Sequence, residues 1–153
     1  MNGTEILSNQ MSDLKVNFLT GAYTRLWESW GEKNISPAYN KFYYLTKGRF
    51  MISISGKEYE GRPGQLFLLP SSSLQTYHAY QDDTAEKYWI HCTFSCGERD
   101  LTEIVSLSPF VQVDNPEYLA SLFREILDCA GSSDLPRVLR QKELLTRLLI
   151  YYI

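Results

Sequence analysis

The stretch from Tyr43 to Ser95 constrains the fold most, because short strand-like segments follow one another there with turn residues between them. In its middle, the turn Arg62-Pro63-Gly64 leads into the apolar run Leu66-Phe67-Leu68-Leu69. Pro70 ends this run, since proline has no backbone N–H to donate to a neighbouring strand. Short apolar strands closed by glycine and proline turns are typical of a small antiparallel barrel or jelly roll.

The pattern predicts about eight strands at close spacing. They are expected at Leu14–Phe18, Tyr23–Trp30, Tyr39–Leu45, Phe50–Ile54, Glu58–Glu60, Leu66–Leu69, Leu74–Tyr80 and Lys87–Phe94. Gly21 is expected to separate the first strand from the second, and Gly31–Asn34 to form a turn. Residues 1–13 are polar and have no period, so we expect a flexible arm there.

A helical hairpin is predicted after the strands. Asn115 and Pro116 are a typical helix start, and apolar residues follow at helical spacing as far as Leu127. Gly131 is a natural helix end, and a second helix with a wide apolar stripe follows from Leu135. This helix reaches the end of the chain without a polar tail. We expect it to lead into a further domain, the alternative being a docked helix that simply ends.

Composition narrows the function classes. The chain has 153 residues, a net charge of -3 and a pI of about 5.4, so it is not expected to hold nucleic acid by itself. The start of the sequence lacks a basic region followed by a long apolar run, so we expect no signal peptide, and no apolar run reaches membrane-spanning length. The three cysteines (Cys92, Cys96 and Cys129) lack paired metal spacing. Reduced thiols in the cytoplasm are therefore expected.

The order of three segments resembles the N-terminal cupin domain of AraC-type transcriptional regulators. These segments are the hairpin Tyr43–Arg49, then Gly64–Pro70, then Tyr88–His91. The sequence departs from the family pattern at Ser72, where glycine is usual, and at Cys92, where phenylalanine is usual. The resemblance covers roughly residues 15–153, and the predicted helical hairpin also fits it.

The resemblance implies a mainly β fold with C-terminal helices: a cupin-like double-stranded β-helix, or jelly-roll barrel, followed by a helical hairpin. The barrel is expected over residues 14–98, and a helical dimerisation and linker region over 99–153. Bacterial regulators of this type bind DNA through C-terminal helix-turn-helix motifs, which lie outside this chain. The implied partners are a small polar effector, with a sugar expected, and a second copy of the chain.

Many cupins are metalloenzymes, but this sequence departs from their ligand pattern. Lys41 stands where the first cupin motif needs a carboxylate, no histidine precedes it, and Gln75 replaces the histidine of the second motif. Strand alternation turns His78 away from Gln75. No catalytic residues are recognisable either. We therefore expect no metal, no cofactor and no enzymatic activity.

The resemblance and strand alternation together indicate which side chains face the barrel lumen. On the last long strand, Lys87, Trp89 and His91 share one face, while Ile90, Cys92 and Phe94 share the other. The predicted ligand-binding residues are Trp30, Lys41, Tyr43, Gln75, Tyr77, Trp89 and His91. Each of them has an alternative role as an ordinary core or barrel-mouth residue.

In the second helix, Leu145, Leu148, Leu149 and Tyr152 are predicted to pack against a partner protomer, the alternative being that they only cover the barrel. Two rival functions remain open at this point. One is a cupin enzyme such as a metal-independent sugar isomerase, and the other is a stand-alone carbohydrate-binding module.

Overall fold

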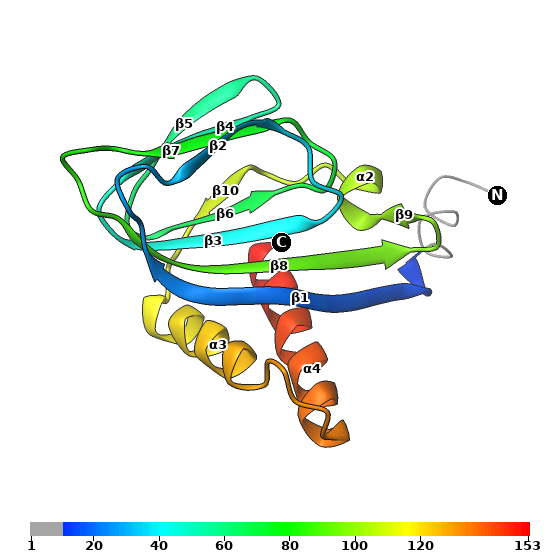
Figure 1. Cartoon of the computed structure of the whole chain (residues 1–153). Coiled ribbons are helices and arrows are strands. Elements are labelled where there is room, and N and C mark those ends of the chain that lie inside the picture. Colours follow the sequence, from blue (N-terminus) through cyan, green and yellow to red (C-terminus); the bar gives the residue numbers. More distant parts are fainter. Residues whose placement is uncertain (1–10) are drawn as a thin grey trace.

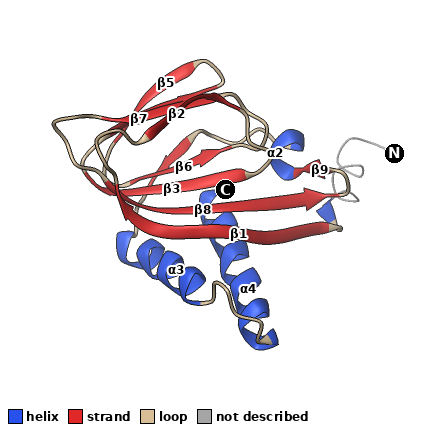
Figure 2. Cartoon of the chain, in the orientation of Figure 1, coloured by secondary structure: helices blue, strands red, loops and turns tan. Residues whose placement is uncertain are grey.

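A computed structural model describes residues 11–153 as two antiparallel sheets that face each other, with helices outside one of them (Figures 1 and 2). The larger sheet has the order β1-β8-β3-β6-β10, with β9 paired to β8, and the smaller sheet has the order β2-β7-β4-β5. α3 and α4 cover the outer face of the larger sheet. This architecture confirms the predicted jelly-roll barrel followed by a helical hairpin.

The strands are β1 (Leu14–Arg25), β2 (Gly31–Ile35), β3 (Asn40–Lys47), β4 (Phe50–Ile54), β5 (Lys57–Gly61), β6 (Gln65–Leu69), β7 (Gln75–Ala79), β8 (Glu86–Cys96), β9 (Arg99–Asp100) and β10 (Phe110–Gln112). The helices are α2 (Leu101–Ile104), α3 (Pro116–Asp128) and α4 (Leu135–Tyr152). None of the helices in residues 11–153 is both long and apolar enough to cross a membrane.

Two hydrophobic cores lie on opposite faces of the larger sheet. Side chains alternate between the faces of a strand, so Tyr43 and Leu45 of β3 point between the two sheets, while Phe42 and Tyr44 point to the helices. β3 lies between β8 and β6 and is buried on both faces. The barrel interior and the helix-covered core therefore share one central layer.

The helical hairpin forms as its sequence predicts. Asn115 accepts a hydrogen bond from the backbone N–H of Tyr118, and Pro116 occupies the first turn of α3. The buried residues of α3 include Phe123, whose ring stacks on Tyr88 with centroids 5.4 Å apart. This contact fastens α3 to β8, on the side of the sheet away from the barrel interior.

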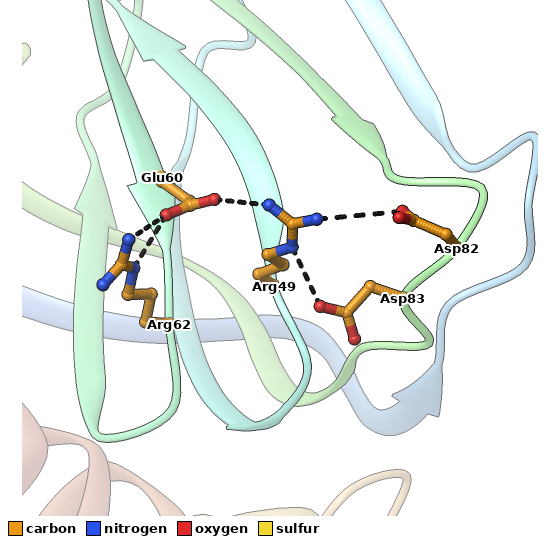
Figure 3. A network of polar contacts seen from close by, with 5 residues as sticks. All are labelled: Arg49, Glu60, Arg62, Asp82 and Asp83. Carbon is orange, nitrogen blue, oxygen red and sulfur yellow. Dashed lines mark hydrogen bonds and ion pairs between the residues drawn. The ribbon is translucent and has the colours of Figure 1, made fainter.

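An ion-pair network joins three segments at the edge of the smaller sheet (Figure 3). Arg49, next to β4, pairs with Glu60 of β5 at 3.0 Å and with Asp83 of the β7–β8 loop at 3.0 Å. Glu60 also pairs with Arg62, and Arg49 lies 3.8 Å from Asp82. These groups are partly exposed, so the network orients the loop more than it stabilises the fold.

Two predicted boundaries near the start of the chain are wrong. β1 runs unbroken from Leu14 to Arg25, so Gly21 does not end a strand. A Cβ at Gly21 would lie 2.6 Å from the Trp89 carbonyl and 3.0 Å from Leu127 of α3. The glycine therefore allows close approach to its neighbours rather than forming a turn. The predicted turn at Gly31–Asn34 belongs to β2, which pairs with β7.

The predicted dimer residues of α4 require a correction. Leu145, Leu148, Leu149 and Tyr152 are at most 4% exposed and belong to the core between α4 and the larger sheet. Their face of the amphipathic helix covers the barrel, as the alternative interpretation held, so they are not available to a partner. The outward face instead carries Leu135, Leu139 and Ile150.

The predicted division of the chain crosses a sheet. β10 lies beyond the expected barrel boundary at residue 98, yet it pairs with β6 and forms the edge of the larger sheet. Most of the predicted N-terminal arm, residues 1–10, lies outside the described residues.

Candidate functional site

A pocket of about 380 Å³ opens between the two sheets, a volume within the usual range for small-molecule sites. Its walls come from β1, the β1–β2 connection, β3, β7 and β8. The lining residues are Thr24, Leu26, Trp27, Trp30, Tyr43, Tyr77, Lys87, Trp89 and His91. Residues far apart in the sequence therefore converge on one site.

The aromatic side of the pocket contains all 3 tryptophans of the chain. The indole of Trp30 stacks on Tyr77 with ring centroids 4.7 Å apart. Trp89 donates its indole N–H to Thr24 Oγ1 at 2.8 Å, which fixes the ring against β1. Trp27 is 55% exposed and lies at the solvent side. These flat apolar faces are suited to stacking against a ligand.

The polar side of the pocket is built by the pairing of β3 with β8. Lys41 lies opposite His91, Tyr43 opposite Trp89, and Leu45 opposite Lys87. Lys87 is 2% exposed and its Nζ lies 3.2 Å from the centroid of the Tyr43 ring. Lys41 is 1% exposed and donates a hydrogen bond to Tyr77 Oη at 3.0 Å.

Burial lowers the pKa values of three side chains at the polar side of the pocket: Lys41, Lys87 and His91. It lowers the pKa of Lys87 well below its ordinary value, and the charge of Lys41 lowers it further. Burial lowers the pKa of Lys41 to about 8, against an opposing effect of Glu32. Burial and the two lysines lower the pKa of His91 to about 4, so this imidazole is neutral at pH 7.

The structure brings five of the seven sequence-predicted ligand residues to this pocket: Trp30, Tyr43, Tyr77, Trp89 and His91. Lys41 lies behind the lining and contacts Tyr77. Gln75 is not among the lining residues, and its Nε2 donates to Pro70 O at 3.3 Å and Ser73 Oγ at 3.2 Å. Gln75 Oε1 is buried without a hydrogen-bond partner among residues 11–153.

Lys87 is the main pocket residue that sequence reasoning left out of the candidate set. The signal for it was present, because strand alternation places Lys87 on the face of Trp89 and His91. Thr24, Leu26 and Trp27 were also missed. They come from the end of β1 and the turn after it, where the predicted strand boundaries were wrong.

A larger hollow of about 660 Å³ lies beside this pocket and shares Trp30 and Tyr77 with it. Two of its charged residues, Glu32 and Glu58, are exposed to solvent and lie on the smaller sheet. Among the described residues, no group of three or more His, Cys, Asp or Glu side chains is placed to hold a metal ion. We take the smaller pocket as the candidate site because its polar groups are buried.

The sequence of residues 40–149 matches the family model of the AraC-like ligand binding domain. The chain belongs to this family. The matched region includes β3, β7 and β8, which carry most of the pocket, and most of the helical hairpin. This AraC-like domain is therefore a ligand-binding domain with a cupin-like barrel. No curated protein matches the chain.

Solved structures, two of them cupin domains, are similar to this domain at low sequence identity. The cupin 2 conserved barrel domain protein from Salinispora arenicola is 13% identical, with 52% of this chain and 75% of that chain covered and a TM-score of 0.41. The Cnp3 cupin domain of Schizosaccharomyces pombe is 9% identical, with coverages of 51% and 63% and a TM-score of 0.42. The plu4264 protein from Photorhabdus luminescens is 19% identical, with a TM-score of 0.40. The alignment with plu4264 covers 46% of this chain and 59% of plu4264.

Proposed function

We propose that this chain is the effector-sensing and dimerisation domain of a bacterial AraC-type transcriptional regulator in the cytoplasm, and not an enzyme. One observation supports the proposal most: a barrel of the AraC-like ligand binding family holds a pocket with aromatic walls and buried polar groups. The effector would favour one arrangement of the barrel and hairpin, and so reposition DNA-binding domains that lie outside this chain. The acidic chain itself, at net charge -3, is not proposed to contact DNA.

The chemistry of the pocket favours a small hydroxylated ligand of sugar size. Indole and phenol rings bind the C–H faces of a sugar, while Tyr77, His91 and Lys87 supply polar atoms for its hydroxyl groups. Each buried neutral hydrogen bond contributes about 0.5–1.5 kcal/mol net, so several must act together. The fluorescence of all 3 tryptophans reports on this pocket, which makes a sugar library screen by intrinsic fluorescence a direct test.

Replacing Trp89 with alanine is expected to weaken effector binding by roughly 10- to 100-fold, because an aromatic contact of about 1.5–3 kcal/mol is lost. Calorimetric titration measures this change. Trp89→Phe keeps an aromatic face and loses only the bond to Thr24, so it should retain part of the affinity. The dimer should persist in both variants. If Trp89→Ala unfolds the protein, Trp89 is a core residue. A folded Trp89→Ala protein that binds the effector as tightly as the parent would show that the proposed contact is wrong.

We also propose that a second copy of the chain binds the outward face of α4. Leu135, Leu139 and Ile150 are 66%, 56% and 67% exposed there and lie along one stripe at helical spacing. In AraC-type regulators, which the chain resembles, helices of this region join two protomers. Pairing two copies of the stripe would remove these side chains from water, which is the usual driving force of a helical interface.

Replacing Leu139 with glutamate is expected to convert the dimer to a monomer without unfolding it, since a charge would enter the interface from an exposed position. Sedimentation velocity measures the mass. Ser133→Glu, in the connection before α4, adds the same charge outside the stripe and should leave the dimer intact. A Leu139→Glu protein that remains dimeric would show that the copies pair through another surface.

NMR of the sugars after incubation with the protein tests the enzymatic alternative in the same samples. Conversion of a sugar without added metal would overturn the regulator proposal in favour of a metal-independent isomerase. An unchanged sugar that nevertheless alters the fluorescence supports a sensing role.

A further inference from the structure

Two buried lysines, Lys41 and Lys87, face the barrel interior, and no acidic side chain of residues 11–153 forms an ion pair with either. Within residues 11–153, the ammonium group of Lys87 makes no hydrogen bond and no ion pair, and its Nζ lies 3.2 and 4.7 Å from the ring centroids of Tyr43 and Trp30. Among the described residues, the ammonium group of Lys41 makes one hydrogen bond, to the neutral hydroxyl of Tyr77. Both side chains are almost fully removed from water. The barrel thus holds two amines where a core would ordinarily hold apolar groups.

This arrangement is unfavourable for the empty protein. A buried ammonium group loses its hydration, and aromatic rings replace only part of that stabilisation. The two amines also repel each other, which is one cause of the lowered pKa of Lys87. Methionine or leucine at these two positions would make the folded protein more stable than lysine does. Local choices that oppose stability are expected at functional sites.

The titratable groups that face the two amines are Tyr39, Tyr43, Tyr77, His91 and Glu32. Burial raises the pKa of Tyr43 and Tyr77, so these phenols are uncharged at pH 7. His91 is uncharged as well. Glu32 is exposed on β2 and makes no ion pair with either lysine. Residues 11–153 therefore supply no compensating negative charge inside the barrel, and Lys87 lines the pocket where a ligand would sit.

We infer that the effector is a sugar acid, whose carboxylate enters the pocket and pairs with Lys87, with Lys41 contributing the second positive charge. This inference rests on the proposed function and defines its ligand class. A carboxylate forms charge-assisted hydrogen bonds with ammonium groups, and these are stronger than neutral ones. The aromatic rings would then bind the carbon face of the same molecule, leaving His91 to accept or donate hydrogen bonds to hydroxyls.

If a carboxylate binds in this way, the lysine amines must take up protons on binding. The empty pocket disfavours protonated lysine, and a bound carboxylate favours it, so binding raises the pKa of both amines. Affinity for the acid should therefore fall as the pH rises through about 8, where Lys41 loses its proton in the empty protein. A neutral sugar gains nothing from the charge, and its affinity should not fall in the same range.

The test compares matched pairs of ligands by fluorescence and calorimetric titration at pH 7. D-glucuronate and D-galacturonate are set against D-glucose and D-galactose, and D-gluconate adds an acid that has no aldehyde to react with an amine. D-glucose 6-phosphate distinguishes a phosphate from a carboxylate. We expect at least one carboxylate to bind roughly tenfold or more tightly than its neutral counterpart, and calorimetry in two buffers of different ionisation enthalpy to show proton uptake.

The decisive variant is Lys87→Met, with Lys47→Met as its control. Methionine keeps much of the volume and removes the buried amine, so the variant without ligand should unfold at a higher temperature than the parent protein. Its affinity for the acid should drop at least tenfold, to the level of the neutral sugar. Lys47 is 70% exposed and pairs with Glu86 outside the pocket. Its replacement should change neither the binding nor the unfolding temperature appreciably.

The outcomes separate the inference from the proposed function. A neutral sugar that binds as tightly as its acid, or an acid that binds Lys87→Met unchanged, overturns the sugar-acid inference and leaves the sugar sensor in place. Tighter binding of the phosphate than of every carboxylate also overturns it. If neither acids nor neutral sugars alter the fluorescence, the sugar-sensing function itself fails.

Discussion

Replacing Phe123 with alanine is expected to lower the free energy of unfolding by about 3–5 kcal/mol, the typical cost of removing a large aromatic side chain from a core. Phe123 is fully buried at the centre of the contact between α3 and the larger sheet. Its ring stacks on Tyr44 and Tyr88, with centroids 6.0 and 5.4 Å apart. The cavity would open between a helix and two strands that cannot close on it without leaving their hydrogen-bonded positions.

Urea denaturation followed by circular dichroism measures this change. Arg124→Ala is the matched control. Arg124 follows Phe123 on the same helix and faces solvent, and arginine and alanine have similar helix propensities. This substitution should change the free energy of unfolding by less than about 0.5 kcal/mol. A loss below about 1 kcal/mol for Phe123→Ala would mean that α3 packs on the barrel only loosely.

Replacing Asp100 with alanine is expected to cost roughly 2–4 kcal/mol, because buried donors would lose their acceptor. The carboxylate of Asp100 accepts hydrogen bonds from Asn40 Nδ2 at 3.0 Å, from the backbone N–H of Phe94 at 2.9 Å, and from the backbone and hydroxyl of Thr102. Asn40 in turn accepts from the backbone N–H of Ser71 at 2.8 Å. Asp100 thus joins the end of β8, the start of β3 and α2.

Thermal and chemical denaturation of Asp100→Ala and Asp100→Asn test this network. The Asp100→Asn protein keeps one acceptor oxygen, so its free energy of unfolding should fall less than that of the Asp100→Ala protein. Glu98→Ala, an exposed acid two residues earlier, removes the same charge and should have little effect. Equal stability of the Asp100→Ala and Glu98→Ala proteins would show that water replaces the carboxylate.

The fold was predictable because its signals are local. Glycine and proline turns marked the ends of β4, β5 and β6, and the Asn115–Pro116 cap marked the start of α3. The sequence did not show that Gly21 lies within a strand, since its role depends on Leu127, which is more than one hundred residues away. A close approach of this kind leaves no trace in the neighbouring residues.

The site was predictable to the extent that strand alternation determines a face. Alternation placed Trp89 and His91 on the inner face of β8, and both line the pocket. It did not show where along the barrel the pocket lies, and Gln75 is held by the turn at Pro70–Ser73 instead. The α4 residues were misassigned because an apolar stripe alone does not reveal which of two surfaces covers it.

Because side chains alternate along β8, the residues that line the pocket and the residues that contact the helices are immediate chain neighbours. Trp89 and His91 face the pocket, while Tyr88, Ile90 and Cys92 face the helix-covered core. A shift of this strand would move both sets of side chains, because Trp89 is the chain neighbour of Tyr88, whose ring stacks on Phe123 of α3. For the same reason, we expect β8 not to tolerate an insertion. One added residue would exchange the two faces of the strand beyond it and turn the polar side chains of the pocket toward the helices.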